Sequence, residues 1–558
     1  MSADGSPRSF SALLPALAPE RGRIFSVYLS ATTSALTLSA LGALAAWGVG
    51  HAVVERTLPG TAWWVWLVVL VAARAVLTWH EMDRSHAVAY RVLARLRLVL
   101  FDSYSRSVPA RRREHSGRAA AVAMDDIEKL EFFYAHTIAQ VAAALTAFLA
   151  ALVAVLLVLP PAGAALAVGA VLVVATVPML ARAARRRGAQ EQQQRAELST
   201  QIVDALGALR EVLSYGLAEA VTTQALRTTY RATRAGRRRG TIGQLVAGIR
   251  DLIVTTTVLA VILVSATAAG VLGGDARISP ATLPMLVALA LAGVAAVADA
   301  ATTLTQLHPL TASAARVDRA LHRPPVVIAT GQARPVPNGP LGLRLRDITF
   351  SYDDRVEAIS AWSAEIRPGE HVGLAGRSGS GKSTLIALAA RLWQPTSGTI
   401  ELFTADGQTV PLRDVDEHAL RNTIAFVDQE ATLFHGTVRE NLLRGAAPVS
   451  DDTLRRTLER VDAIGWAPLD LSIGQGGLAL SGGQRARLAL ARALVRQPRI
   501  LLIDEVTASL DAETERVISN ALAAYHGTVL IASHRSETLS AASRVIAVDG
   551  GVLTGAPQ

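Results

Sequence analysis

The stretch GRSGSGKST, residues 376–384, combines three glycines with a lysine and several hydroxyl side chains. The short run before it, residues 371–375, is apolar at Val372 and Leu374, and residues 385–393 after it have an apolar pattern with helical spacing. The stretch therefore predicts a strand, a glycine loop and a helix in succession.

The loop fits the pattern G-x-x-x-x-G-K-S. Its glycines would let backbone N–H groups turn toward an anion at a helix start, where the helix dipole also favours negative charge. Lys382 can then reach the β- and γ-phosphates of a nucleotide, and Ser383 can bind Mg²⁺. A glycine- and serine-rich loop can also be a plain linker, so the surrounding sequence has to decide. The predicted phosphate site consists of Gly376, Arg377, Ser378, Gly379, Ser380, Gly381, Lys382, Ser383 and Thr384.

The composition indicates a membrane protein with more than one domain. The chain has 558 residues, of which 51% are hydrophobic, and a mean hydropathy of +0.33. These values are too apolar for an ordinary soluble protein. The chain contains no cysteine, which excludes disulfides, thiolate metal sites and cysteine nucleophiles.

The basic charge follows the expected membrane topology. The net charge is +9, and arginines crowd into residues 84–118 and 182–239, which flank long apolar runs. Cytoplasmic loops of membrane proteins are rich in Arg and Lys. Topology thus accounts for the charge, and we expect no nucleic-acid partner.

Six apolar segments have the length of about 20 residues that a helix needs to cross a bilayer. Short links join them in pairs, whereas long basic links follow the second and the fourth, so these links and both chain ends are predicted to be cytoplasmic. The long links favour helix and are expected to continue the membrane helices. The segments are residues 24–49, 61–79, 138–159, 162–180, 252–272 and 280–298.

The beginning of the chain has no cleavable signal pattern. Leucines at Leu13, Leu14 and Leu17 precede Arg21 and Arg23. This arrangement predicts a short helix that lies on the inner membrane surface.

A segment rich in Pro and Gly, residues 322–340, follows the sixth apolar segment. Beyond it, short apolar runs alternate with helical stretches, which predicts an α/β domain with a largely parallel central sheet. We therefore expect a helical membrane domain over residues 1–321, a linker over 322–340 and an α/β P-loop nucleotide-binding domain over 341–558. The predicted strands include residues 423–427, 500–503 and 529–532.

The stretch RILLIDE places Asp504 and Glu505 at the end of an apolar strand. A carboxylate at such a strand end can hold Mg²⁺ through water beside Ser383, and Glu505 can polarise an attacking water. An apolar run that ends in two acids is commonly structural. Together with the phosphate loop at this spacing, it predicts a nucleotide site.

A second glycine-rich helix start lies in LSGGQRARLALARAL, residues 480–494, and can bind an anion. Its polar and glycine residues are Ser481, Gly482, Gly483 and Gln484. With this signature between the other two motifs, the chain resembles the ATP-binding cassette (ABC) family over essentially its whole length. It is similar to half-transporters in which six membrane helices of the exporter type are fused to one nucleotide-binding domain.

The resemblance implies roles for residues that match the motifs of the family. Tyr352 is similar to the aromatic residue that stacks on adenine, and Gln429 to the residue that senses the γ-phosphate and Mg²⁺. Asp511 resembles the residue that crosses to the partner domain, and His534 the residue that contacts the γ-phosphate. The implied Mg²⁺ ligands are Ser383, Gln429 and Asp504.

The resemblance also implies a dimer that clamps two ATP molecules, each between the phosphate loop of one chain and the signature of the other. The partner is a second copy or a related chain. Segments 112–118 and 206–215 are expected to couple the domains. Gln475, in SIGQGG, stands where such exporters usually have an acid, which leaves one charged contact with the membrane domain in doubt.

Polar residues inside the apolar segments are the candidates for contact with a substrate. They are Arg74 in the second segment and Asp299 at the inner end of the sixth, followed by the pair Arg250 and Asp251. The alternative is that they snorkel or pair near the interface. The stretch HEMDRSH, residues 80–86, lacks the histidine spacing of a zinc helix.

The expected function is ATP-driven transport of a small molecule across a bacterial plasma membrane, with export favoured. The stretches AYRVLARLRLVLFDS and EFFYAHTIAQ resemble the first cytoplasmic loop of thiol exporters for cytochrome assembly and of siderophore importers with the exporter fold. A drug, lipid, thiol, peptide or siderophore remains open as the substrate. The alternatives are an importer with the exporter fold and an ABC protein that gates a channel or regulates a partner.

Overall fold

The computed structural model describes residues 14–109, 116–273, 275–307, 310–328, 333–352, 357–430, 432–477, 479–506, 511–549 and 552–554. The chain divides into two compact units. The first comprises residues 1–103 and 115–322, and the second comprises residues 104–114 and 323–558. Of the expected coupling segment 112–118, residues 112–115 lie outside the described residues.

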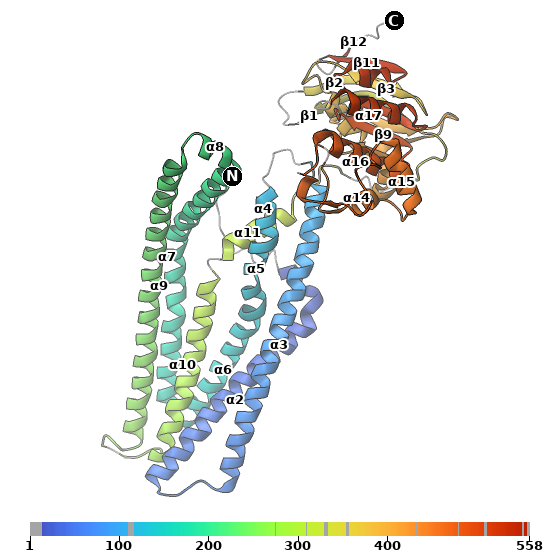
Figure 1. Ribbon diagram of the computed structural model, residues 1–558. Helices are drawn as coiled ribbons and strands as arrows, with labels where there is room; N and C mark the ends of the chain where they lie inside the picture. Colours follow the sequence, from blue (N-terminus) through green and yellow to red (C-terminus); the bar gives the residue numbers. More distant parts are fainter. Residues whose placement is uncertain are drawn as a thin grey trace. The chain divides into compact units, whose positions relative to one another are not determined.

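Helices make up the described part of the first unit (Figure 1). Two of its turns, η2 and η3, are π-helical, and η1 and η4 are 3₁₀-helical. The elements are η1 Leu14–Glu20, α2 Arg21–Val54, α3 Thr61–Arg106, α4 Ser116–Ala121, η2 Val122–Asp126, α5 Ile127–Lys129, η3 Phe133–Thr137, α6 Ile138–Val158, α7 Pro160–Gly207, α8 Leu209–Ser214, α9 Ala218–Ala268, η4 Pro280–Thr282, α10 Leu283–Gln306 and α11 Leu310–Leu321.

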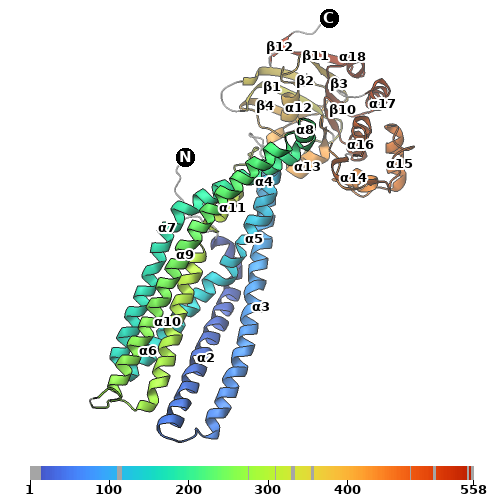
Figure 2. The ribbon, with the colours of Figure 1, turned by 60° about the vertical axis from the view of Figure 1, so that its left-hand side comes forward.

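The two longest helices, α7 and α9, run side by side and are joined at one end by the short α8 (Figure 2). Small residues allow this close approach, since a Cβ on Gly169 would lie 2.2 Å from the Thr257 hydroxyl oxygen. Apolar residues of α6, α7, α9 and α10 form the core of the unit, among them Val155, Leu166, Val261 and Leu286.

Among the described residues, six helical segments are long and apolar enough to cross a membrane, which confirms the prediction of six spans. Helices α3, α7 and α9 extend far beyond their apolar parts, so the predicted continuation of the membrane helices into the long links is also confirmed. The segments are Pro15–Val54, Thr61–Arg106, Ala119–Val158, Pro160–Met179, Ala218–Ala268 and Pro280–Gln306.

The chain enters the first span through a 3₁₀-helix rather than an α-helix. Pro19 lies inside this helix and cannot supply the backbone N–H that a continuing α-helix needs. Glu20 at its end is buried and pairs with Arg23 and Arg95. The start of α2 is therefore bonded to α3, where sequence reasoning expected only contact with the membrane surface.

The described part of the second unit contains two main sheets. The six-stranded sheet has the order β12-β11-β3-β10-β9-β6, and its strands are parallel except for β12, which confirms the predicted largely parallel sheet. The four-stranded sheet, in the order β2-β1-β4-β5, is antiparallel and was not predicted. The strands are β1 Gly342–Ser351, β2 Glu357–Ile366, β3 His371–Ala375, β4 Ser397–Phe403, β5 Thr409–Pro411, β6 Ile424–Val427, β7 Gly436–Thr437, β8 Ser472–Ile473, β9 Ile500–Asp504, β10 Thr528–Ala532, β11 Arg544–Asp549 and β12 Val552–Thr554.

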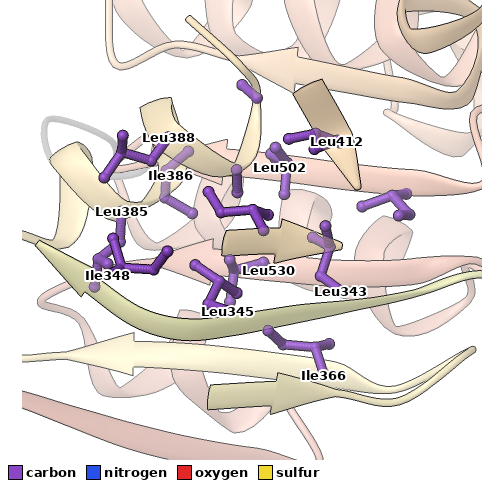
Figure 3. Packing of buried hydrophobic residues seen from close by; sticks show 14 of the residues in the cluster. Leu343, Leu345, Ile348, Ile366, Leu385, Ile386, Leu388, Leu412, Leu502 and Leu530 are labelled. Atoms are coloured by element: carbon purple, nitrogen blue, oxygen red, sulfur yellow. The ribbon is translucent and has the colours of Figure 1, made fainter. Parts of the chain in front are cut away.

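Helix α12 packs in a core between these two sheets (Figure 3). Leu385 and Ile386 on α12, Leu345 on β1 and Leu502 on β9 are almost completely buried there. A rigid core thus supports the start of α12. The remaining helices of the unit are α12 Lys382–Ala389, η5 Leu412–Asp414, α13 Glu417–Thr423, α14 Val438–Leu443, α15 Asp451–Arg460, η6 Gln475–Gly477, α16 Gly482–Val495, α17 Ala512–Ala523 and α18 Ser536–Ser540.

Candidate functional site

The glycine loop 376–381 joins β3 to α12, in the strand, loop and helix order that the sequence predicts. A Cβ on Gly376 would lie 2.1 Å from the Val548 carbonyl oxygen, and one on Gly381 would lie 2.5 Å from the Ile359 Cδ1 atom. Gly381 also has a φ of 101°, a value that favours glycine. Side chains are therefore excluded at these two positions, and backbone lines the loop.

Lys382 is the first residue of α12 and is only 3% exposed. Its Nζ atom donates hydrogen bonds of 3.0 Å to the carbonyl oxygens of Gly376 and Arg377. The same atom lies 3.1 Å from His534 Nε2 and 3.7 Å from Glu505 Oε1. The ammonium group is thus held in the loop with an acid and a histidine beside it.

Three adjacent parallel strands bring these groups together. Lys382 lies beyond the end of β3, Glu505 directly follows β9, and His534 follows β10, which pairs with both other strands. The carboxyl ends of parallel strands in an open sheet are where such proteins bind ligands. Residues more than 150 positions apart in the chain, Lys382 and His534, meet there for this reason.

His534 Nε2 also lies 2.9 Å from Glu505 Oε1. This single ring nitrogen can accept a hydrogen bond from Lys382 or donate one to Glu505, but it cannot do both at once. The backbone of Glu505 is fixed in an uncommon conformation, with a φ of 43°, and its N–H donates to the carbonyl oxygen of Ala532 at 3.0 Å. The arrangement can hold and move a proton beside the loop.

Ser383 and Asp504 form the second polar contact of the site. The Ser383 hydroxyl donates a hydrogen bond of 2.7 Å to Asp504 Oδ1. Burial raises the pKa of the Asp504 carboxyl, because its charge is poorly solvated, while the bond from Ser383 acts in the opposite direction. A divalent cation bound at this carboxylate would stabilise the charged form.

The residues of the loop fit a bound nucleotide with its metal ion. The Ser380 hydroxyl is buried and has no hydrogen-bond partner in the described part of the chain, so it can accept a ligand as partner. The hydroxyl of Ser383 and the carboxylate of Asp504 are oxygen donors, which Mg²⁺ prefers. Mg²⁺ held there would supply positive charge to phosphate oxygens.

Tyr352 and Gln429 lie at the edges of this cluster. The Tyr352 hydroxyl is 2.9 Å from the Thr384 hydroxyl oxygen, and its ring packs edge-on against Trp393. Gln429 is exposed just beyond β6, the strand beside β9. The predicted roles of Tyr352 and Gln429 remain predictions.

The signature residues begin α16. The Ser481 hydroxyl accepts a bond of 3.2 Å from the Gln484 N–H, and the Gln484 side chain accepts one of 2.9 Å from the Ser481 N–H. This reciprocal capping fixes the helix start. Ser481 and Gly482 are exposed, and a Cβ on Gly483 would lie 3.0 Å from the Thr514 hydroxyl oxygen. The helix start is therefore formed and accessible in the single chain.

Asp511 caps α17 by accepting a bond of 3.3 Å from the Thr514 N–H. The side-chain hydrogen bond with Thr514 is the main reason why the pKa of Asp511 is lowered. Gln475 lies in the short helix η6. The structure gives Asp511 a local role at a helix start, and its predicted contact with a partner domain remains a prediction.

Sequence reasoning missed the network that holds the segment after His534. Glu515 on α17 is 3% exposed and accepts bonds from Arg535 Nη1 at 2.6 Å and from the Thr538 hydroxyl at 2.8 Å. Since Arg535 directly follows His534, this buried carboxylate positions the histidine. The one sign of this network in the sequence is that Glu515, four residues after Asp511, shares a helix face with Ile518 and Leu522.

The polar candidates in the spans have partners of their own. Arg74 on α3 donates a hydrogen bond to the hydroxyl of Ser34 on α2. Asp299 on α10 is exposed within the single chain and interacts electrostatically with Arg250 on α9. Arg250 thus acts on Asp299 of a neighbouring helix through its charge, whereas the sequence paired Arg250 with Asp251.

His86 on α3 and His136 in η3 approach each other. His86 Nδ1 lies 3.0 Å from Glu131 Oε1, and the rings of His86 and His136 are 5.1 Å apart. Within the described ranges, no group of three or more acidic or histidine side chains has the arrangement of a metal site.

Comparison with known proteins gives the family. Residues 23–308 match the family model for the ABC transporter transmembrane region, and residues 359–508 match the model for the ABC transporter itself. The chain belongs to the ABC transporter family. It is a half-transporter with an exporter-type fold, because one membrane domain and one nucleotide-binding domain share the chain.

Relatives and a solved structure extend this family assignment. The chain is 32% identical, over 84% of its length and 81% of the relative's, to the glutathione/L-cysteine transport system ATP-binding/permease protein CydC of Escherichia coli. It is 40% identical to the ATP-dependent lipid A-core flippase of Thiobacillus denitrificans, over 38% of each chain. A bacterial Atm1-family ABC exporter with ATP bound has the same fold, with a TM-score of 0.84 at 20% identity over 96% of this chain and 94% of that one. As a member of this family, the chain couples ATP hydrolysis to transport.

Proposed function

We propose that this half-transporter exports a small molecule across the bacterial plasma membrane as a dimer, with its nucleotide-binding domain in the cytoplasm. The observation that carries the proposal is the convergence of Lys382, Glu505 and His534 at three strand ends. This cluster belongs to a chain that also has six candidate spans. Hydrolysis and translocation are thereby combined in one polypeptide.

The cluster supports a division of labour in hydrolysis. Lys382 binds the β- and γ-phosphates in a loop lined by backbone N–H groups, and Ser383 and Asp504 would hold Mg²⁺. Glu505 accepts the proton of the attacking water, because its carboxylate is the acid nearest to the loop lysine. His534 orients Glu505 and contacts the γ-phosphate.

The formed and accessible helix start at Ser481 supports a dimer. In this proposal, residues 481–484 of one chain contact the ATP bound by the partner, with the helix N-terminus facing the phosphates. Gln429 senses the same phosphates from the edge of the sheet, and Tyr352 stacks on the adenine. A second copy of this chain or a related chain supplies the other half.

Small thiols are the proposed substrate class. The relative named for glutathione and L-cysteine transport aligns over 84% of this chain, whereas the lipid A-core flippase aligns over only 38%. The longer alignment includes the membrane domain, where a substrate binds. Import with the same fold, or gating of a channel by ATP, are the alternative functions.

The test uses proteoliposomes in which the nucleotide-binding domain faces the outer solution. ATP is expected to drive uptake of radiolabelled glutathione or L-cysteine at least about tenfold above a Glu505→Gln blank. Uptake that requires ATP inside the vesicles, with the opposite orientation, would instead establish import. ATP binding without any ATP-dependent flux of either thiol, in either orientation, would contradict the proposed substrate class.

A further inference from the structure

Helix α11 follows the last span and packs with one face against η2 and α5. The buried side chains are Ser313, Ala314, Val317 and Ala320, none of which is more than 3% exposed. Their spacing is that of one face of an α-helix. Apolar contact therefore docks α11 on the segment that leads into the third span.

A charged group lies inside this apolar contact. Asp126, at the end of η2, is 3% exposed. Arg316 donates to both of its carboxylate oxygens, from Nε at 2.7 Å and from Nη2 at 2.6 Å. The Ser313 hydroxyl donates a third bond of 2.8 Å to Asp126 Oδ1. The carboxylate is thus held from two positions on α11.

Such a pair does little for stability compared with apolar residues of the same size, because the buried Asp126 charge loses its water, although the Arg316 side chain stays 33% exposed. Its geometry is specific, however. A two-pronged bond between a guanidinium group and a carboxylate fixes both distance and orientation. The pair therefore sets one register and one rotational position for α11 on η2, which apolar contact alone would leave less defined.

Asp125 and Asp126 are consecutive residues of the π-helical turn η2, so their side chains point in different directions and have different partners. Asp125 is exposed and pairs with Lys129 Nζ at 2.5 Å, whereas Asp126 is buried against α11. A π turn contains one residue more than an α-helical turn and is frequent at functional sites. The turn gives the chain a matched pair of adjacent acids, one in the contact and one outside it.

Helix α11 stands in the chain between the last span and the linker. Residues 322–340, which lead to the nucleotide-binding domain, begin directly after α11. The Ser103 hydroxyl near the end of α3 donates a buried bond of 2.7 Å to the Ala320 carbonyl oxygen. Helix α11 is therefore bonded to chain segments on both sides of the loop that joins the second and third spans.

We propose that Asp126, Arg316 and Ser313 form a coupling clamp, which makes α11 and the adjoining ends of the spans move as one body. A displacement that reaches the end of α3, η2 or α11 is then shared by all three instead of being lost in rotation of α11. These three are positioning residues for ATP-driven transport. The clamp depends on neither the substrate nor the direction proposed above.

The test separates hydrolysis from the response of the spans. Since the chain has no cysteine, Leu58→Cys and Leu272→Cys, both at exposed positions near span ends, carry two spin labels without background. The distance distribution between the labels is measured on the full chain in lipid nanodiscs, without nucleotide and with ATP plus vanadate. Asp126→Asn is compared with the matched control Asp125→Asn.

In Asp126→Asn, we expect kcat and KM for ATP to stay within about twofold of the parent while the nucleotide-induced shift of the label distance falls at least about threefold. Asp125→Asn should retain the full shift. A full shift in Asp126→Asn, or an equal loss of hydrolysis and shift, would overturn the clamp. Should Asp126→Asn fail to fold, Arg316→Lys is judged by the same criteria, because it keeps the charge and loses the two-pronged bond.

Discussion

The polar contacts of the strand-end cluster are long-range, whereas most hydroxyl groups of the spans bond within their own helix, with the bond from Arg74 to Ser34 as an exception. In the cluster, Lys382 contacts His534, and Ser383 contacts Asp504, over more than a hundred residues of sequence. In the spans, hydroxyls bond to carbonyl oxygens one helical turn earlier, as in Thr37 to Thr33 and Thr302 to Ala298. The first kind of contact requires a specific residue at each position, and the second requires only a hydroxyl.

This difference explains why the nucleotide site is evident in the sequence and the substrate is not. Long-range contacts to a phosphate leave fixed residue types at fixed spacing. Local bonds within a helix satisfy the side chain without reference to any ligand. Substitutions in the two regions should therefore differ in how far they reduce ATP hydrolysis.

Lys382→Ala should reduce ATP hydrolysis by about 10²–10³, because it removes the charge that contacts the transferred phosphate. The rate of phosphate release by the chain in lipid measures this reduction in hydrolysis. The only other lysine, Lys129, is half-exposed and pairs with Asp125, so Lys129→Ala is the matched control and should hydrolyse ATP at the parent rate. Equal activity of both variants would remove Lys382 from the site.

Gly376→Ala should destabilise the nucleotide-binding domain by about 2 kcal/mol or more, since its Cβ would overlap the Val548 carbonyl oxygen and the backbone has to move. Thermal unfolding and ATP affinity measure the effect. At Gly407, which also has a positive φ of 88°, a Cβ meets nothing within 4 Å, so Gly407→Ala carries only the conformational cost. Similar losses in both would show that the close approach at residue 376 is unimportant.

Asp299→Asn should have the smallest effect on hydrolysis, with the basal rate within about twofold of the parent, because the residue lies outside the nucleotide-binding domain. If Asp299 contacts substrate, the increment in hydrolysis that glutathione induces should fall. Glu219→Gln, at an exposed acid on α9 that is not a substrate candidate, is the control. An unchanged increment in Asp299→Asn would assign this residue to its interaction with Arg250 alone.

The sequence predicted the spans, the parallel sheet and the residues of the strand-end cluster, because each has a local signature. Six long apolar runs and a glycine loop between a strand and a helix need no knowledge of distant contacts. The antiparallel sheet β2-β1-β4-β5 was missed, since its strands pair across a long stretch that includes β3 and α12. The bond between Asp126 and Arg316 was missed for the same reason, as these residues are 190 positions apart.

The Glu515 network beside His534 shows a further limit. Its carboxylate has the sequence context of an exposed acid in the first turn of a helix, yet it is buried by α18 and the segment that contains Arg535. Burial depends on which helix packs against α17, and a single sequence does not indicate this. Position-specific motifs therefore identify groups that contact a ligand more readily than groups that hold them.

The most direct test of the account is Mg-ATP hydrolysis by the full chain in lipid, together with any partner chain that it requires, measured beside Glu505→Gln. If the strand-end cluster is the site of hydrolysis, turnover should be at least about a hundredfold above that variant, which should bind ATP and accumulate as a closed, ATP-loaded dimer. Turnover by Glu505→Gln at the parent rate would contradict the assignment of the strand-end cluster as the site of hydrolysis.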